Sequence, residues 1–179
     1  MDTHFWLYNK DHTHIDDYEV MHFDGKTVSL DENTRFVASK PTKLVAHGLG
    51  GGTHIDHIFN AAYAKAGYDY NVIGIDWRDL QGDGYKAILD LAGNHSARFL
   101  KGMVEDYKLK LNDVHAIGFS YGTHVIGDWH TLQMFTGNYR VLRADFCNIY
   151  RKNPVIFTDC REIPANIAGF PCRYCRNPP

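Results

Sequence analysis

Several features are missing from this sequence, and each absence narrows what the chain can be. No apolar run approaches the length needed to cross a membrane, so a transmembrane segment is excluded. A net charge of −2 gives no electrostatic reason to expect nucleic acid or an anionic membrane surface as a partner. The first residues, Met1 to His4, lack the basic and apolar regions of a signal peptide. The chain is therefore either cytosolic or a secreted chain whose leader is not part of this sequence.

Cysteine is absent before residue 147. All four cysteines lie in the C-terminal stretch, at Cys147, Cys160, Cys172 and Cys175. An even number of clustered cysteines predicts disulfides formed in an oxidising compartment, with four free thiols in a reducing cell as the alternative. The Cys172-x-x-Cys175 pair is only half of a zinc site, because no second pair or nearby histidine follows it. We therefore expect no metal ion and no other cofactor.

Three strands are predicted near the start of the chain, at residues 4–8, 18–23 and 27–30. Asp24-Gly25, between the last two, is a typical hairpin turn. The loop after the first strand contains His12-Thr13-His14 and Asp16, whose side chains have the donor atoms of a metal site. Exposed loop histidines are commoner than metal ligands, so we interpret them as surface residues.

The motif Gly118-Phe119-Ser120-Tyr121-Gly122 joins an apolar run to a helical pattern. In that context G-x-S-x-G is typical of a nucleophile elbow, the sharp strand-to-helix turn that exposes a serine hydroxyl above a parallel sheet. The turn is strained and tightly packed, so a Cβ at either glycine would clash. Ser120 is therefore the candidate nucleophile.

A second glycine-rich stretch, His47-Gly48-Leu49-Gly50-Gly51-Gly52, follows an apolar run at residues 43–46. Glycines let the backbone approach a ligand closely and point its N–H groups at it. A flexible loop is the alternative, but the position between a core strand and a helix favours an anion or oxyanion cradle. Thr53 and Asp56 are spaced as a capping pair at the start of that helix, and Gly67 is a suitable stop.

The order of the predicted elements indicates the fold class. From residue 43 onward, strands are predicted at residues 43–46, 71–77, 114–117 and 141–142, with helical patterns between them. Such alternation predicts parallel βαβ units in a three-layer α/β fold. A chain of 179 residues with 44% apolar residues is long enough for one domain with a sizeable core. Asp76 ends a strand where α/β sheets place functional groups, and we interpret it as a structural acid that caps the next loop.

A serine hydroxyl needs a general base, oriented by a carboxylate, and donors for the developing oxyanion. In an α/β-hydrolase these donors are the N–H of the residue after the serine and one N–H of the early glycine loop, here Tyr121 and Leu49. The base should follow the serine in the chain. Only His124 and His130 follow Ser120, on a helix that carries them away from the hydroxyl. The sequence therefore predicts a nucleophile and an oxyanion hole without a triad histidine.

Four segments in order resemble the animal lipase family of pancreatic lipase, its phospholipase A1 relatives and their insect homologues. They are Phe5-Trp6-Leu7-Tyr8, the stretch from Pro41-Thr42-Lys43 to His47-Gly48-Leu49, Tyr70 to Asp76-Trp77, and Val114 to His124. The resemblance implies an α/β-hydrolase-type fold with a mostly parallel sheet. It also implies a secreted carboxylic ester hydrolase that acts on triacylglycerol or phospholipid. Ser120 would be its nucleophile, and Leu49 and Tyr121 its oxyanion donors.

The resemblance leaves two alignments open for the acid and the base. In one, Asp145 follows the serine at close to the family's spacing and is the triad acid, although Phe146-Cys147 replaces the Pro-Ala expected after it. In the other, Cys147-Asn148-Ile149-Tyr150-Arg151 resembles the segment that carries the catalytic histidine. Ile149 then occupies the position of the base, and the acid, the lid and later strands are missing. We favour the second alignment, in which the sheet is incomplete at its C-terminal side.

These observations lead to two hypotheses for function. The first is a lipase-family ester hydrolase that uses Ser120, Leu49, Tyr121 and Asp145. The second is a non-catalytic lipase-like protein, truncated or degenerate, that binds lipid or a partner through the same cleft. An α/β domain with an accidental motif is a third reading, which four ordered segments disfavour. We expect residues 1–145 to form the hydrolase core and 146–179 an irregular cysteine-containing tail. By resemblance, the location is extracellular and the partner is a lipid or a lipid interface.

Overall fold

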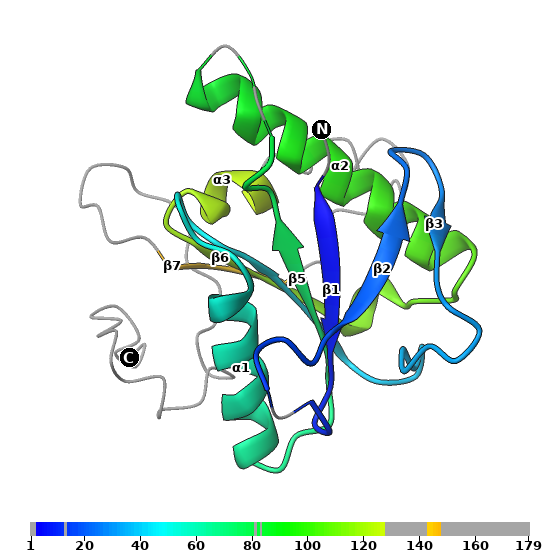
Figure 1. Ribbon diagram of the computed structural model, residues 1–179. Helices are drawn as coiled ribbons and strands as arrows, with labels where there is room; N and C mark the ends of the chain where they lie inside the picture. Colours follow the sequence, from blue (N-terminus) through cyan, green and yellow to red (C-terminus); the bar gives the residue numbers. More distant parts are fainter. Residues whose placement is uncertain (1–2, 13, 81, 83, 128–142, 148–179) are drawn as a thin grey trace, which may run out of the picture.

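The computed structural model describes residues 3–12, 14–80, 82, 84–127 and 143–147. Seven strands form one sheet in the order β3-β2-β1-β5-β4-β6-β7 (Figure 1). The strands are β1 (His4–Tyr8), β2 (Glu19–Phe23), β3 (Val28–Ser29), β4 (Thr42–Ala46), β5 (Asn71–Asp76), β6 (Val114–Phe119) and β7 (Arg143–Cys147). The helices are α1 (Thr53–Lys65), α2 (Tyr85–Glu105) and α3 (Gly122–Gly127), and a 3-10 turn spans Leu111–Asp113.

The sheet has a parallel half and an antiparallel half. Strands β5, β4, β6 and β7 are parallel neighbours, whereas β2 pairs antiparallel with both β3 and β1, and β1 pairs antiparallel with β5. The predicted α/β fold is confirmed, and its βαβ alternation gives the parallel half. The hairpin at Asp24-Gly25 is also confirmed: Gly25 has a φ of 89°, and Asp24 Oδ1 accepts hydrogen bonds from the N–H groups of Lys26 and Thr27.

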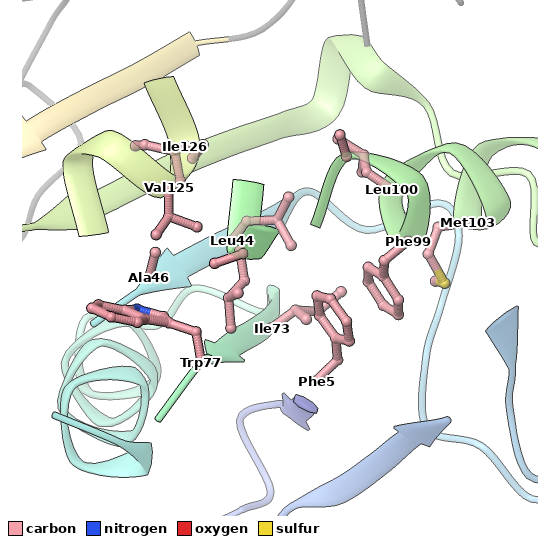
Figure 2. Close-up of a cluster of buried hydrophobic side chains, with 14 of the residues drawn as sticks. Phe5, Leu44, Ala46, Ile73, Trp77, Phe99, Leu100, Met103, Val125 and Ile126 are labelled. Atoms are coloured by element: carbon pink, nitrogen blue, oxygen red, sulfur yellow. The ribbon is translucent and has the colours of Figure 1, made fainter. Parts of the chain in front are cut away.

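Helices cover the two faces of the sheet (Figure 1), because strand side chains alternate between the faces. On one face α2 and α3 pack over Phe5, Leu44 and Ile73, forming the larger core that Figure 2 shows. On the other face α1 packs over Tyr8, Val45, Val72 and Ile117. The carboxyl ends of β4 and β6 lead into the glycine loop and into Ser120, so this three-layer arrangement places both motifs at one end of the parallel strands.

The predicted capping pair at the start of α1 is wrong. The N-cap residue is Gly52, with no side-chain cap, and Thr53 is already helical. Asp56 does not reach back to the helix end, because it is only 2% exposed and lies against β5. A Cβ added at Gly74 would come within 1.7 Å of Asp56 Oδ2, so the glycine makes the room that this carboxyl group occupies. The predicted stop is confirmed, because Gly67 follows the last helical turn with a φ of 83°.

Several predictions fall outside the described residues. These are the continuation of the helix through Trp129 and Leu132, the strand at 141–142, and everything from residue 148 onward, including Ile149 and the last three cysteines. Within the part of the chain that the structure describes, no helix combines the length and the apolar character needed to cross a bilayer.

Candidate active site

Ser120 lies at a strained turn between β6 and α3. Its φ is 53°, a left-handed value that non-glycine residues rarely adopt and that costs about 1–3 kcal/mol. Hydrogen bonds maintain the turn: the N–H and the hydroxyl of Thr123 both donate to the Ser120 carbonyl, at 3.1 and 2.7 Å, and the N–H of His124 donates to the Tyr121 carbonyl at 3.0 Å. This is the backbone geometry of the nucleophile elbow that the sequence predicted.

Both glycines of the motif are required by close packing. A Cβ at Gly118 would lie 2.6 Å from Thr123 Cα, in the first turn of α3. A Cβ at Gly122 would lie 2.2 Å from the carbonyl oxygen of Ala46 and 2.6 Å from that of His47. The elbow therefore fits directly against its own helix and against the end of β4.

The strain at Ser120 gives a stability prediction. We expect Ser120→Gly to raise the free energy of unfolding by about 1 kcal/mol, because glycine adopts positive φ without a Cβ penalty. Ser120→Ala retains the penalty and should leave stability nearly unchanged, which makes it the matched control. Urea denaturation followed by tryptophan fluorescence measures both. If the two variants prove equally stable, the turn is not strained in solution.

The glycine loop lies beside the serine. A Cβ at Gly48 would stand 3.0 Å from Ser120 Cβ, so the two backbones are in contact. Gly50 has a φ of 69°, and the N–H of Gly51 donates to the Gly48 carbonyl at 3.0 Å, which closes a tight turn around Leu49. The Leu49 side chain is 53% exposed. The structure thus brings together Ser120 with the two residues predicted as oxyanion donors, Leu49 and Tyr121.

A buried polar cluster lies at the base of this loop, and sequence reasoning found only part of it. His47 Nε2 is 3.1 Å from Asp76 Oδ1, and the His47 ring stacks on Trp77 at 5.0 Å between centroids. Arg78 donates two hydrogen bonds to the same carboxylate, from Nε to Oδ1 at 2.9 Å and from Nη2 to Oδ2 at 2.6 Å. The Arg78 N–H also donates to Asp76 Oδ1, so the loop-capping role predicted for Asp76 is present. Its pairing with His47 was missed.

The two buried carboxyl groups near this cluster are shifted in opposite directions. Burial by itself raises the pKa of Asp76, but hydrogen bonds from His47 and Arg78 outweigh it and hold that pKa well below its usual range. Burial raises the pKa of Asp56 to about 7, and the neighbouring charge of Asp76 acts in the same direction. Asp56 Oδ1 has no hydrogen-bond partner. At neutral pH Asp76 is therefore an anion, whereas Asp56 retains its proton to a much higher pH than an exposed carboxyl group does.

Among the residues that the structure describes, no histidine ring nitrogen is hydrogen-bonded to the Ser120 hydroxyl. His124 is exposed, and its ring lies 6.2 Å from that of Tyr121, which stacks on Tyr85. Asp145 lies in β7 opposite Ile117 of β6. His130 falls outside the described residues. The absence of a base from the whole chain therefore stays a prediction.

The prediction that the loop histidines are surface residues is wrong for His12 and confirmed for His14. His12 is buried, its Nδ1 accepts the N–H of Asn9, and its Nε2 lies 2.9 Å from Arg35. Burial, followed by the charge of Arg35, lowers the pKa of His12. This side chain lines a cavity of about 340 Å³ together with Asp17, Tyr18, Glu19, Asp31, Asn33 and Arg35. Among the described residues, no three acidic, histidine or cysteine side chains are grouped to hold a metal ion.

A strained serine at the end of a parallel strand, with a glycine loop against it, defines the class of α/β-hydrolase-type proteins. The chain belongs to the Lipase family, whose profile matches residues 1–133. The described elements from β1 to α3 all lie within this match. The family resemblance inferred from four sequence segments is thereby confirmed.

Among curated proteins, the chain is similar to lipoprotein lipases. It is 37% identical to that of Mus musculus over 101 residues, which are 53% of this chain and 21% of the mouse protein. It is 34% identical to that of Neovison vison over 109 residues, which are 58% of this chain and 23% of that protein. The chain thus spans about a fifth of the length of these relatives. A carboxylesterase from Lactobacillus plantarum aligns over 82% of this chain and 55% of its own, at 15% identity and a TM-score of 0.40, which adds nothing to the assignment.

Proposed function

We propose that this chain carries the nucleophile and the oxyanion hole of a lipase-family carboxylic ester hydrolase. The observation that supports this most directly is the positive φ of Ser120 with Gly48 in contact with it. A stable globular domain gains nothing from such strain, whereas a nucleophile needs the exposure that the turn provides. Similarity to proteins named lipoprotein lipase supports a lipid ester, triacylglycerol or phospholipid, as the substrate.

The chemistry would follow the acyl-transfer scheme. The Ser120 hydroxyl attacks the acyl carbonyl, and the N–H groups of Leu49 and Tyr121 donate to the oxyanion that forms. Asp145 is our proposed acid, because its strand lies parallel to β6 and next to it. A base would take the serine proton and return it to the leaving alcohol. The oxyanion hole alone retains weak catalysis when the base is absent.

We extend the proposal to the setting of the reaction. Residues 1–145 form the hydrolase core, and residues 146–179, of which the first two complete β7, form a tail whose cysteines pair as disulfides. The protein acts outside the cell, at a lipid interface. Its substrate is a triacylglycerol, or a phospholipid that it cleaves as a phospholipase A1 does. The exposed Leu49 and Tyr121 beside Ser120 suit an apolar substrate. The net charge of −2 gives no reason to add a nucleic-acid partner.

A non-catalytic lipase-like binding protein is the second candidate. The observation that favours it is that no histidine among the described residues is hydrogen-bonded to the Ser120 hydroxyl. Such a protein would retain the elbow and the glycine loop as a scaffold and bind lipid, or a partner, through the same cleft.

A serine-directed fluorophosphonate probe separates the two candidates. We expect the folded chain to be labelled slowly, because the oxyanion hole activates the serine without a base, and labelling should be lost in Ser120→Ala. Ser39→Ala is the matched control, because Ser39 is exposed and lies outside the motif. Added imidazole, a diffusible base, should accelerate labelling of the wild type. A folded chain that stays unlabelled with and without imidazole would leave the binding protein as the function.

A further inference from the structure

The Gly48–Leu49 peptide is held from its carbonyl side. The Gly48 oxygen lies 2.6 Å from His47 Nδ1 and 3.0 Å from the N–H of Gly51. A carbonyl oxygen can only accept hydrogen bonds, so His47 Nδ1 must carry the hydrogen and donate it. Two hydrogen-bond donors at the Gly48 carbonyl fix the orientation of the Gly48–Leu49 peptide plane.

Fixing this carbonyl also fixes the N–H of Leu49. The two groups belong to the same peptide, and in a trans peptide they point in opposite directions. The structure contains no cis peptide bond among the residues it describes. Hydrogen bonds into the carbonyl also polarise the peptide and strengthen its N–H as a donor. The contacts behind the loop therefore set both the direction and the strength of the Leu49 donor.

His47 is itself immobilised. Its side chain is 2% exposed and its ring stacks on Trp77, whose indole N–H donates to the His47 carbonyl at 3.0 Å. Its Nε2 lies between the N–H of Trp77, at 3.2 Å, and Asp76 Oδ1, at 3.1 Å. Because Nδ1 already donates to Gly48, the hydrogen bond from Nε2 to Asp76 requires a hydrogen on both ring nitrogens. A ring with one hydrogen instead accepts the N–H of Trp77 at Nε2. In both states Nδ1 keeps its hydrogen for Gly48.

Arg78 completes the arrangement from the surface. Its guanidinium group forms the forked pair with Asp76, and the Arg78 side chain is half exposed while the Asp76 side chain is 4% exposed. A Cβ at Gly52 would lie 2.7 Å from Arg78 Cζ, so the guanidinium packs on the last residue of the glycine loop. Arg78 thus links the carboxylate that faces His47 to the end of the loop that His47 holds.

We propose that His47 is the positioning residue of the oxyanion hole, holding the Gly48–Leu49 peptide through Nδ1 while Asp76 and Arg78 hold the imidazole. The inference rests on the proposed function, because it assigns Leu49 N–H as an oxyanion donor. His47 does not touch the substrate. It acts through the peptide that does.

Two substitutions at His47 test this with matched geometry. The amide nitrogen of asparagine can stand where Nδ1 does, and that of glutamine where Nε2 does. His47→Asn therefore keeps the donor to Gly48, and His47→Gln loses it, while both lose the stacking on Trp77. Gly48-Leu49 is the single Gly-Leu pair in the sequence. Protein labelled with carbonyl-13C glycine and 15N leucine thus gives one carbonyl–amide NMR cross-peak, which reports on this peptide and needs no enzymatic activity.

We expect the Gly48 carbonyl resonance to move upfield in His47→Gln and to stay near the wild-type value in His47→Asn. Labelling of Ser120 by the fluorophosphonate should slow about 10-fold or more in His47→Gln and recover in His47→Asn, since loss of one oxyanion donor costs about 10²–10³ in rate. Equal resonances in the two variants would overturn the inference, and so would equal labelling rates if the wild type is labelled. If the resonances behave as expected and no form is labelled, His47 positions the Gly48–Leu49 peptide but the proposed hydrolase function is wrong.

Unsubstituted protein provides a second test if either variant fails to fold. With 15N histidine and carbonyl-13C glycine, a through-hydrogen-bond coupling between His47 Nδ1 and the Gly48 carbonyl carbon is expected. Its absence, with the Gly48 resonance resolved, would overturn the inference.

Discussion

Gly122→Ala will lower the free energy of unfolding by about 3 kcal/mol, the upper end of the range for overpacking, because the new methyl group meets main-chain atoms. The new Cβ would lie 2.2 Å from the Ala46 carbonyl oxygen and 2.6 Å from that of His47. Both are main-chain atoms at the end of β4, so no side-chain rotation relieves the clash. Helix α3 must then move away from β4 and carry Tyr121 with it. Urea denaturation measures the loss, and slower fluorophosphonate labelling reports the displacement.

Gly82→Ala is the matched control for this variant. Gly82 is exposed, and the nearest atom to an added Cβ is Ile88 Cγ1 at 3.3 Å, on a side chain that can move. We expect a change of less than about 1 kcal/mol, as for most surface substitutions. A Gly122→Ala protein as stable as Gly82→Ala would contradict the close approach of α3 to β4.

The contribution of Asp56 to stability should fall as the pH rises from about 4 to about 8. Its pKa is about 7 in the folded chain, against an ordinary value of 3.8. Between these values the folded state holds a proton that the unfolded state has released. The stabilising contribution is therefore fully present below pH 4 and is lost as the pH rises through 7. A shift of this size corresponds to at most about 4 kcal/mol.

Asp76 contributes with the opposite sign. Its pKa is depressed in the folded chain, so its contribution is present above about pH 4 and is lost as the pH falls further. The combined contribution of these two carboxyl groups is therefore greatest near pH 4 to 5. Burial lowers the pKa of His12 and that of His57, so their contributions have the opposite sign to that of Asp56 and are lost as the pH falls below about 6.5.

Asp56→Asn isolates the first of these effects. The amide has the same shape and no charge, so the variant should match the wild type near pH 4.5 and exceed it by about 2–4 kcal/mol at pH 8. Chemical denaturation across this pH range measures the difference. Asp113→Asn, at an exposed position in the 3-10 turn, should run parallel to the wild type. Parallel curves for Asp56→Asn as well would show that Asp56 is not buried as an acid.

Most of the parallel half of the sheet could be predicted from sequence. The apolar runs at β4, β5 and β6 are bounded by glycine, aspartate or polar residues, and their burial on both faces leaves little ambiguity. Ser120 was predicted for the same reason, because the motif comes with its strand and its helix. Local sequence signals were therefore sufficient to predict these strands and the position of Ser120.

The polar cluster could not be predicted, because it depends on which strands are neighbours. His47 ends β4 and Asp76 ends β5, and the parallel register of these strands brings them together. No local sequence pattern indicates that these two side chains will be in contact. The capping prediction failed for a related reason. Thr53 and Asp56 have the right spacing, but Gly74 on a distant strand leaves room for the Asp56 carboxyl group, which is buried against that strand and not at the helix end.

The order of the strands has a consequence for folding kinetics. Strand β6 pairs with β4, and contacts between them, such as Lys43 with His115, join residues 72 apart in sequence. Closing such a long loop costs entropy before any contact repays it. Because Gly122 packs on the end of β4, the elbow can reach its strained form only after this closure. We therefore expect the left-handed serine to form late on the folding pathway, so that relieving its strain slows unfolding far more than it speeds folding.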